Sequence, residues 1–228
     1  MTATLTEAGK KVLLCDFDPQ ANATSGLGLD KRHIKHSVYD AVINDMPASE
    51  IIAHTNFGDV LPATADLAGA AVELITMDEP NFRLRNALRT VADQYDVILI
   101  DCPPSLELLT LNGLAAADGI LVPVQCEYYA LEGLSDLMAT LRAVKRRLNP
   151  QLEIFGVVLT MFDGRTNFSN QVAEEVRRHF PGKVFASVVP RNVRLAEAPS
   201  HGLPVTGYDR SSRGAKAYLA LAEEILRK

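Results

Sequence analysis

The stretch that decides the fold reads Lys11-Val12-Leu13-Leu14-Cys15-Asp16-Phe17-Asp18-Pro19-Gln20-Ala21-Asn22. It is an apolar strand that runs directly into two carboxylates, Asp16 and Asp18, after which Pro19 ends the strand. In an open parallel sheet, ligands bind outside the carboxyl ends of the strands. The two carboxylates therefore mark either a reaction centre at a sheet edge or simply a turn, because Asp-Pro is a common turn signal.

The composition is that of an ordinary globular chain, with 228 residues, 47% hydrophobic and 22% charged. A net charge of −5 excludes the overall electrostatics of a dedicated nucleic-acid binder, although a local basic face is still possible. The three cysteines form no Cys-x-x-Cys or Cys/His cluster, which indicates buried thiols in a reducing compartment. No apolar stretch approaches the ~20 residues that span a bilayer, and no signal peptide is recognisable, so we expect a cytoplasmic protein without membrane attachment.

Strand and helix patterns alternate along the chain. We expect strands at 11–16, 59–63, 96–101, 119–125, 153–160 and 184–189. We expect helices at 2–8, 38–44, 48–54, 66–75, 82–94, 106–117, 131–148, 167–179 and 214–226, with mostly loop at 21–35. The runs at 96–101 and 119–125 are continuously apolar, which predicts strands buried on both faces. The alternation predicts an α/β fold, a mostly parallel sheet with helices on both faces, and a single domain over residues 1–228.

Polar and turn-forming residues follow the C-terminal ends of the predicted strands. They are Asp16 and Asp18, Pro62-Ala63-Thr64, Asp101-Cys102-Pro103-Pro104, Gln125-Cys126-Glu127, Thr160-Met161-Phe162-Asp163 and Pro190-Arg191-Asn192. An apolar strand that ends in Asp is how a nucleotide hydrolase holds Mg²⁺ near phosphate, usually through a water. Two such strand ends, one followed by Pro-Gln and one by Pro-Pro, indicate a nucleotide hydrolase more specifically than a single one does.

The segment from Asp16 to Gly28 resembles the second nucleotide motif of the ParA/Soj chromosome-partitioning ATPases, relatives of MinD. Further segments resemble the same family in order, from about Glu7 to the end of the chain. They are Leu61-Pro62-Ala63-Thr64, Asp101-Cys102-Pro103-Pro104-Ser105, the run 123–133, the run 160–166 and the run 190–200. The resemblance implies a P-loop NTPase-like fold of the deviant Walker A class.

The resemblance also implies a site for ATP and Mg²⁺. Asp18 would position the hydrolytic water, and Asp101 would be the Walker B carboxylate that holds Mg²⁺ through a water. Asp16 would help to shape the site. The residues implied around the adenine are Met161, Phe162, Pro190 and Asn192. A switch that senses the γ-phosphate would contain Pro103, Pro104 and Ser105.

The function implied by the resemblance is partitioning of a chromosome or plasmid by an ATPase located on the nucleoid. Members of the family form an ATP-dependent homodimer that binds DNA without sequence preference, and a ParB-like centromere-binding protein stimulates hydrolysis. Arg165 and Arg194 are the best candidates for salt-sensitive DNA contacts. For each arginine the alternative is an ordinary solvated surface charge.

The sequence departs from the family at its first motif, the glycine-rich phosphate loop Lys-Gly-Gly-Val-Gly-Lys-Thr-Thr. Neither this loop nor the general form G-x-x-x-x-G-K-[ST] occurs in the 228 residues. Because the loop supplies the N–H groups and lysines that hold the β- and γ-phosphates, we expect that this chain alone binds ATP weakly or not at all. The first strand would be missing too, which would expose strand edges. A misassigned or trimmed start and a true degenerate paralogue both explain the departure, and the intact downstream motifs favour the former.

Two other functions stay open. An ATPase-inactive ParA-like interaction protein fits the absent loop but not the retained Asp18 and Asp101. A MinD-like regulator of cell division would end in an amphipathic membrane helix, whereas Gly214–Lys228 is rich in alanine and contains Glu223 and Glu224. No G-x-G-x-x-G follows a strand, which argues against a dinucleotide-binding enzyme.

Overall fold

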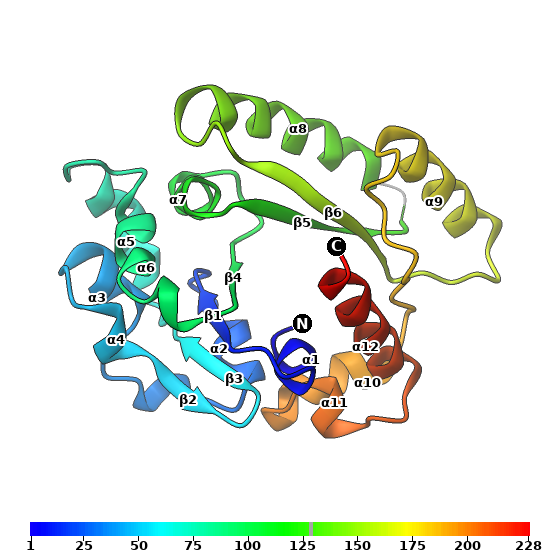
Figure 1. Ribbon diagram of the computed structural model, residues 1–228, viewed down its shortest axis with the longest axis horizontal. Coiled ribbons are helices and arrows are strands. Elements are labelled where there is room, and N and C mark those ends of the chain that lie inside the picture. Colours follow the sequence, from blue (N-terminus) through cyan, green and yellow to red (C-terminus); the bar gives the residue numbers. More distant parts are fainter. Residues whose placement is uncertain (128–129) are drawn as a thin grey trace. The chain divides into compact units, whose positions relative to one another are not determined.

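Strands and helices of the computed structural model are drawn in Figure 1, and the structure describes residues 1–127 and 130–228. Their contacts divide into two compact units. Unit 1 comprises residues 1–117 and 198–204, and unit 2 comprises residues 118–197 and 205–228. Each unit is described by itself.

Unit 1 is built on a four-stranded sheet with the order β2-β3-β1-β4. The strands are β1 (Val12–Asp16), β2 (Ala53–Thr55), β3 (Gly58–Leu61) and β4 (Val97–Asp101). The central strand β1 pairs in parallel with β3 and β4, while β2 is antiparallel to β3. All five residues of β1 are buried, as an apolar central strand requires. The predicted α/β fold with a mostly parallel sheet is confirmed.

Helices cover both faces of this sheet (Figure 1). They are α1 (Thr2–Glu7), α2 (Asn22–Gly26), α3 (Val38–Ile43), α4 (Ala48–Ile51), α5 (Leu67–Leu74), α6 (Arg83–Arg89) and α7 (Leu108–Ala116), with the 3-10 helices η1 (Lys31–His33), η2 (Ala92–Gln94) and η3 (Ala198–His201). Leu13, Cys15 and Phe17 point into the larger core, which α3, α5 and α6 complete. Leu14, which alternates to the other face, packs with Leu27.

Unit 2 contains two parallel strands, β5 (Gly119–Gln125) and β6 (Glu153–Thr160). Its helices are α8 (Ala130–Arg147), α9 (Asn167–His179), α10 (Val193–Glu197), α11 (Val205–Tyr208) and α12 (Arg213–Leu226). Inward-facing valines and leucines of β5 and β6 pack against α8 and α9 around Leu134 and Val176, which are buried. The helix predicted at 131–148 begins at Leu131, whose side chain is outside the described part of the chain.

Three expected elements and one expected loop differ from the structure. The helix expected at 48–54 ends at Ile51, and the chain then forms the β2–β3 hairpin, in which Gly58 adopts φ 119° and Thr55 Oγ1 donates to the Gly58 carbonyl oxygen at 2.6 Å. The helix expected at 82–94 is interrupted between α6 and η2, and the region 21–35 contains α2 and η1. The segment expected as a strand at 184–189 forms only isolated bridges, at Val184 and Pro190.

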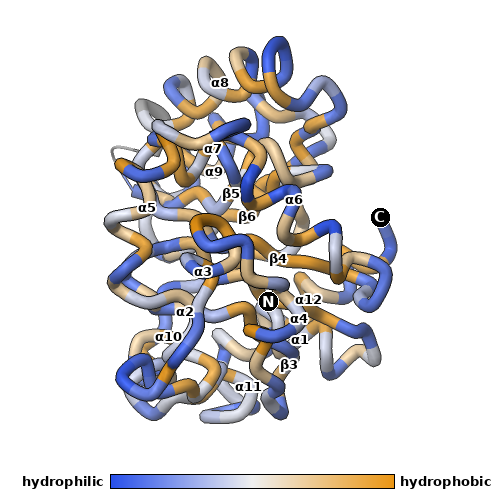
Figure 2. Tube along the Cα trace, turned by 90° about the vertical axis from the view of Figure 1, so that its left-hand side faces the viewer, coloured by the Kyte–Doolittle hydropathy of each residue, from blue (hydrophilic) through white to orange (hydrophobic). Residues whose placement is uncertain are grey.

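The strands at 97–101 and 119–125 are not buried on both faces. Val97 to Ile100 are half-buried although apolar, and Figure 2 colours most of β4 as hydrophobic. In the described part of the chain β4 pairs only with β1, and β5 pairs only with β6. One unpaired edge on each strand accounts for the exposure. Of the helices within the described ranges, none is long and apolar enough to cross a membrane.

Candidate functional site

The pairing of β1 with β4 brings three carboxylates to one edge of the unit 1 sheet. Asp16 lies opposite Asp101 in the parallel register. Beyond the strands, Phe17 N–H donates to the Asp101 carbonyl oxygen at 2.8 Å, which extends the pairing by one residue. Asp18 follows directly, so the structure brings together the three carboxylates that the sequence singled out.

Asp16 is fully buried and its carboxylate is surrounded by donors of its own chain. Oδ2 accepts from Thr24 N at 2.7 Å and from Thr24 Oγ1 at 2.6 Å, and Oδ1 accepts from Asp18 N at 3.3 Å. Burial raises the pKa of Asp16, while the hydrogen bonds from Thr24 and Asp18 act in the opposite direction. Asp16 therefore organises the loop that carries Asp18.

Thr24 is the residue at this edge that sequence reasoning missed. Its side chain is fully buried, and Oγ1 also accepts from Ala63 N at 3.0 Å. One hydroxyl thus connects the end of β1, the helix α2 and the end of β3. The sequence could have pointed to Thr24 only through its place within the motif from Asp16 to Gly28. Its hydrogen-bond partners could not be predicted, because they depend on the tertiary fold.

The loop between Asp18 and α2 is held in an unusual backbone conformation. Ala21 is buried and adopts the left-handed region with φ 51° and ψ 40°, which costs about 1–2 kcal/mol for a residue other than glycine. Ala21 N donates to the Asp18 carbonyl oxygen at 2.9 Å, and Gln20 N donates to Asp18 Oδ1 at 2.9 Å. Lys31 Nζ donates to the Gln20 carbonyl oxygen at 2.6 Å. These contacts fix the half-buried Asp18 carboxylate at the sheet edge.

In the part of the chain that the structure describes, no basic side chain offsets the negative charge of Asp101. Loss of hydration raises the pKa of Asp101 to about 6, and the charges of Asp16 and Asp18 act in the same direction. A cation at this edge would relieve the repulsion. The Asp101 carboxylate is partly desolvated by its surroundings but the residue still reaches solvent, so it fits a Mg²⁺ ion held through water. Within residues 1–127 and 130–228 no three acidic, histidine or cysteine side chains gather closely enough to hold a metal by themselves.

The thiols near this edge have no reactive character. All three cysteines are free, and burial raises the pKa of Cys102 to about 12, with Asp101 and Asp18 adding to the effect. Cys15 is fully buried and its pKa is raised as well, first by burial. Cys15 and Cys126 are buried as predicted, whereas Cys102 is only half-buried.

The segment expected to act as a γ-phosphate switch lies between β4 and α7. Pro104 and Ser105 are exposed, and Pro103 is half-buried. Thr110 Oγ1, on α7, is within hydrogen-bond distance of the carbonyl oxygens of Pro103, at 3.2 Å, and Ser105, at 2.5 Å. The helix α7 thus anchors an otherwise exposed turn that begins at the Asp101 strand end.

In unit 2 the residues expected around adenine gather at two neighbouring chain segments. Phe162 bridges to Pro190, its N–H donates to the Val189 carbonyl oxygen at 3.2 Å, and its carbonyl oxygen accepts from Arg191 N at 3.1 Å. Met161 is half-buried and adopts φ 52°, a strained backbone conformation of the kind found at functional sites.

The fourth of these residues, Asn192, is also half-buried. Its side-chain oxygen accepts from Arg194 N at 3.0 Å, which leaves its amide NH₂ group without a hydrogen bond to any residue of the described ranges. The ring of Phe162 and this donor are chemically suited to a planar base with ring acceptors.

Both arginines expected to contact DNA lie in unit 2 and form ion pairs. Arg165 binds Asp163 through two of its nitrogens, at 2.9 and 2.7 Å, which lowers the pKa of Asp163 to about 2. Arg194 binds Glu197 at 2.7 Å and Asp209 at 3.3 Å. These are exposed pairs, so a DNA phosphate would compete with weak partners. The tyrosine pair 128–129 of the resembling segment lies outside the described residues.

Comparison with known proteins agrees with the fold. The family model described as AAA domain matches residues 1–154. Over 230 residues the chain is 53% identical to the chromosome partitioning protein ParA of Myxococcus xanthus, with 100% of this chain and 81% of that protein covered. It is 54% identical over 225 residues to the sporulation initiation inhibitor protein Soj of Bacillus subtilis, with 98% of this chain and 89% of that protein covered.

Solved structures show the same fold. Cobyrinic acid a,c-diamide synthase from Mycobacterium smegmatis with bound ADP and magnesium superimposes with a TM-score of 0.86 at 36% identity, covering 99% of this chain and 85% of that one. The cell division ATPase MinD of Pyrococcus furiosus superimposes with a TM-score of 0.80 at 27% identity, covering 99% and 90%. The fold is thus that of a P-loop NTPase-like protein.

Sequence identity to the two partitioning relatives identifies one family within that class. The chain belongs to the ParA/Soj family of chromosome-partitioning ATPases.

Proposed function

We propose that the chain is the ParA-type ATPase component of a DNA partition system, with Asp18 as the residue that positions the attacking water. The observation that carries the proposal is the buried Asp16, whose hydrogen bonds with Thr24 and Asp18 hold the Asp18 loop beside Asp101. A nucleotide and magnesium are bound by one solved relative of the same fold.

The proposed chemistry is hydrolysis of ATP to ADP and phosphate. Asp18 Oδ1 is occupied by Gln20 N, while its Oδ2 accepts no hydrogen bond from any residue that the structure describes. That oxygen can accept a hydrogen bond from water and orient it for in-line attack on the γ-phosphorus. Asp101 would hold Mg²⁺ through water, and the ion would neutralise charge that develops on the phosphate oxygens. Met161, Phe162, Pro190 and Asn192 would hold the adenine.

The proposed activity requires a phosphate cradle as well. The 228 residues contain no glycine-rich loop of the form G-x-x-x-x-G-K-[ST], so three carboxylates would face a polyphosphate without backbone donors or a lysine. Repulsion between like charges then opposes binding. We therefore propose that this chain by itself binds ATP weakly or not at all.

The partition role adds DNA and protein partners to the proposal. ATP would drive homodimerisation, and the dimer would bind nucleoid DNA without sequence preference through Arg165 and Arg194. A ParB-like protein would stimulate hydrolysis. Each phosphate contact contributes about −0.9 to the slope of log K against log salt, so Arg165→Ala or Arg194→Ala should weaken DNA binding and flatten that slope while hydrolysis persists. Unchanged DNA affinity in both variants would count against the assignment.

The test uses a chimaera in which a segment carrying Lys-Gly-Gly-Val-Gly-Lys-Thr-Thr, together with its strand, precedes residue 1. We expect it to hydrolyse ATP, and we expect Asp18→Ala to remove hydrolysis while ATP binding is retained. Asp93→Ala, which removes a carboxylate at the exposed helix η2, is the matched control. Hydrolysis by Asp18→Ala at the rate of the control would remove Asp18 from the mechanism.

An ATPase-inactive interaction protein is the second candidate, and the absence of the loop motif from the 228 residues favours it. A chimaera that binds DNA and a ParB-like protein but never ATP would support this candidate. The MinD-like alternative is not favoured. Helix α12 buries Leu221 and Ala222, and its Glu224 accepts from Ala186 N at 2.7 Å and Ser187 N at 2.9 Å, as a packed helix does.

A further inference from the structure

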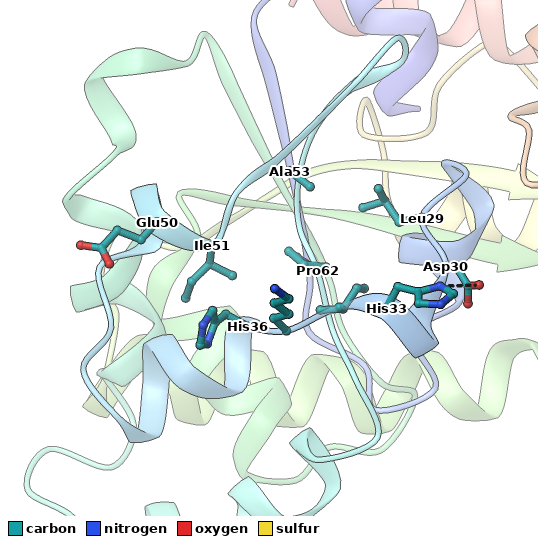
Figure 3. Close-up of a pocket in the computed structure, with 10 residues that line it drawn as sticks. Leu29, Asp30, His33, His36, Glu50, Ile51, Ala53 and Pro62 are labelled. Carbon is teal, nitrogen blue, oxygen red and sulfur yellow. Dashed lines mark hydrogen bonds and ion pairs between the residues drawn. The ribbon is translucent and has the colours of Figure 1, made fainter.

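A hollow of about 350 Å³ lies in unit 1. It is bordered by η1 and the residues after it, by α4, by the edge strand β2 and by the residue that follows β3 (Figure 3). No residue of the proposed nucleotide site or of the proposed DNA contacts lines it.

The floor of the hollow is apolar. Leu29, Ile34, Ile51, Ala53 and Pro62 line it, and Figure 3 shows Leu29, Ile51 and Ala53 around Pro62. These side chains come from separate segments that the fold brings together. Such a floor can bury one or two apolar side chains of a ligand, at about 25 cal/mol for each Å² removed from water.

Neither acidic residue of the lining is directed at a ligand. Asp30 accepts from Arg32 at 2.9 and 3.0 Å, and His33 Nδ1 lies 3.0 Å from Asp30 Oδ2. These contacts, with the Arg32 hydrogen bonds first, hold the pKa of Asp30 well below its usual range. In Figure 3 the Glu50 carboxylate points away from Pro62 and His36.

The remaining polar groups of the lining are basic. Five of the six residues 31–36 are lysine, arginine or histidine. Lys35 is exposed, and its side chain has no hydrogen bond or ion pair with any residue of the described ranges. His36 is half-exposed and lies 4.0 Å from Asp40. An anionic group beside the apolar floor would thus meet the Lys35 ammonium and the His36 imidazole.

We propose that this hollow docks a segment of a partner protein in which a large apolar side chain is followed by carboxylates. The apolar floor takes the side chain, and Lys35 and His36 take the carboxylates. A nucleic-acid backbone would use the basic rim and leave the floor empty, so the combination favours a peptide. The strand β2, which contributes Ala53, is the outer strand of the sheet and can pair with an extended segment.

The test is selection of a phage-displayed library of random short peptides against the 228-residue chain. We expect enrichment of sequences that combine a large apolar residue with neighbouring carboxylates. The selected peptides, labelled with fluorescein, should bind Lys35→Glu at least about fivefold more weakly, which corresponds to about 1 kcal/mol. Ala53→Trp, which fills the floor of the hollow, should weaken the binding of the same peptides by at least the same factor.

Lys10→Glu is the matched control, because it makes the same charge change at an exposed position of unit 1 outside the hollow. It should leave peptide binding unchanged, and thermal melts of each variant separate lost binding from lost folding. Absence of enriched peptides, enrichment of basic peptides, or binding insensitive to both Lys35→Glu and Ala53→Trp would overturn the proposal. So would a DNA duplex that depends on Lys35 while no acidic peptide binds.

Discussion

Replacement of Thr24 by valine tests how the carboxylate edge is held together. Valine keeps the volume of threonine but removes the hydroxyl that donates to Asp16 Oδ2 at 2.6 Å and accepts from Ala63 N at 3.0 Å. All of these groups are buried, so water cannot replace the lost partners. The backbone N–H of Thr24, at 2.7 Å from Asp16 Oδ2, stays in place.

The size of the effect follows from the two lost contacts. A hydrogen bond to a charged group contributes about 1.5–3 kcal/mol, and a buried N–H left without an acceptor costs about 1–3 kcal/mol. Thr24→Val should therefore lower the free energy of unfolding by about 2.5–6 kcal/mol, a large share of a typical total of about 5–15 kcal/mol. Thr24→Ser, which keeps the hydroxyl and loses one buried methyl group, should lower it by only about 1 kcal/mol.

The loss of unfolding free energy in Thr24→Val should also depend on pH, because it depends on the charge of Asp16. The pKa of Asp16 is raised in the folded state, so its protonated form favours folding and this contribution is lost as the pH rises through the folded pKa. Removing the donor raises that pKa further. The deficit of Thr24→Val relative to Thr24→Ser should therefore be larger at pH 8 than at pH 4.

Urea unfolding followed by circular dichroism measures this difference at both pH values. Equal stability of the valine and serine variants would refute the reasoning. A valine deficit that does not change with pH would show that the hydroxyl supports packing or Ala63 alone and has no effect on the charge of Asp16.

Other predictions concern charge and close packing. Asp101→Asn should raise the melting temperature at pH 8, because it removes a carboxylate whose pKa is raised to about 6 by lost hydration and by Asp16 and Asp18, and the gain should shrink as the pH falls towards 4. A gain of the same size at both pH values would contradict this. Gly156→Ala should cost about 1–3 kcal/mol, because the added Cβ would lie 2.2 Å from the Phe185 ring. Gly133→Ala, in helix α8 with open space around the added Cβ, should instead stabilise by about 1 kcal/mol in the same melts.

The parts of the fold that the sequence predicted are those set by local pattern. The apolar run before Asp16 ends at a proline, and a second run ends at Asp101, so parallel pairing of the two strands places the carboxylates at one edge. The short strand β2 was not predictable in this way, because its three residues are a strand only through pairing with β3.

Tertiary contacts explain the features of the fold and the site that the sequence did not predict. Thr24 is polar and buried because two segments far apart in sequence, the Asp16 strand end and Ala63, converge on its hydroxyl. The exposure of β4 depends on which strands flank it and not on its own apolar residues. The basic hollow likewise depends on η1, α4 and β2 lying together, and residues 31–36 alone resemble an ordinary solvated charge run.

We propose that the Asp16, Asp18 and Asp101 edge serves a nucleotide but needs a phosphate-binding loop that these 228 residues lack. Calorimetric titration of ATP with Mg²⁺ into the chain and into the chimaera that carries the loop tests it most directly. We predict a dissociation constant above about 1 mM for the chain and in the range of about 1–100 μM for the chimaera. Tight, Mg²⁺-dependent binding by the chain alone, or none by a folded chimaera, would contradict the account.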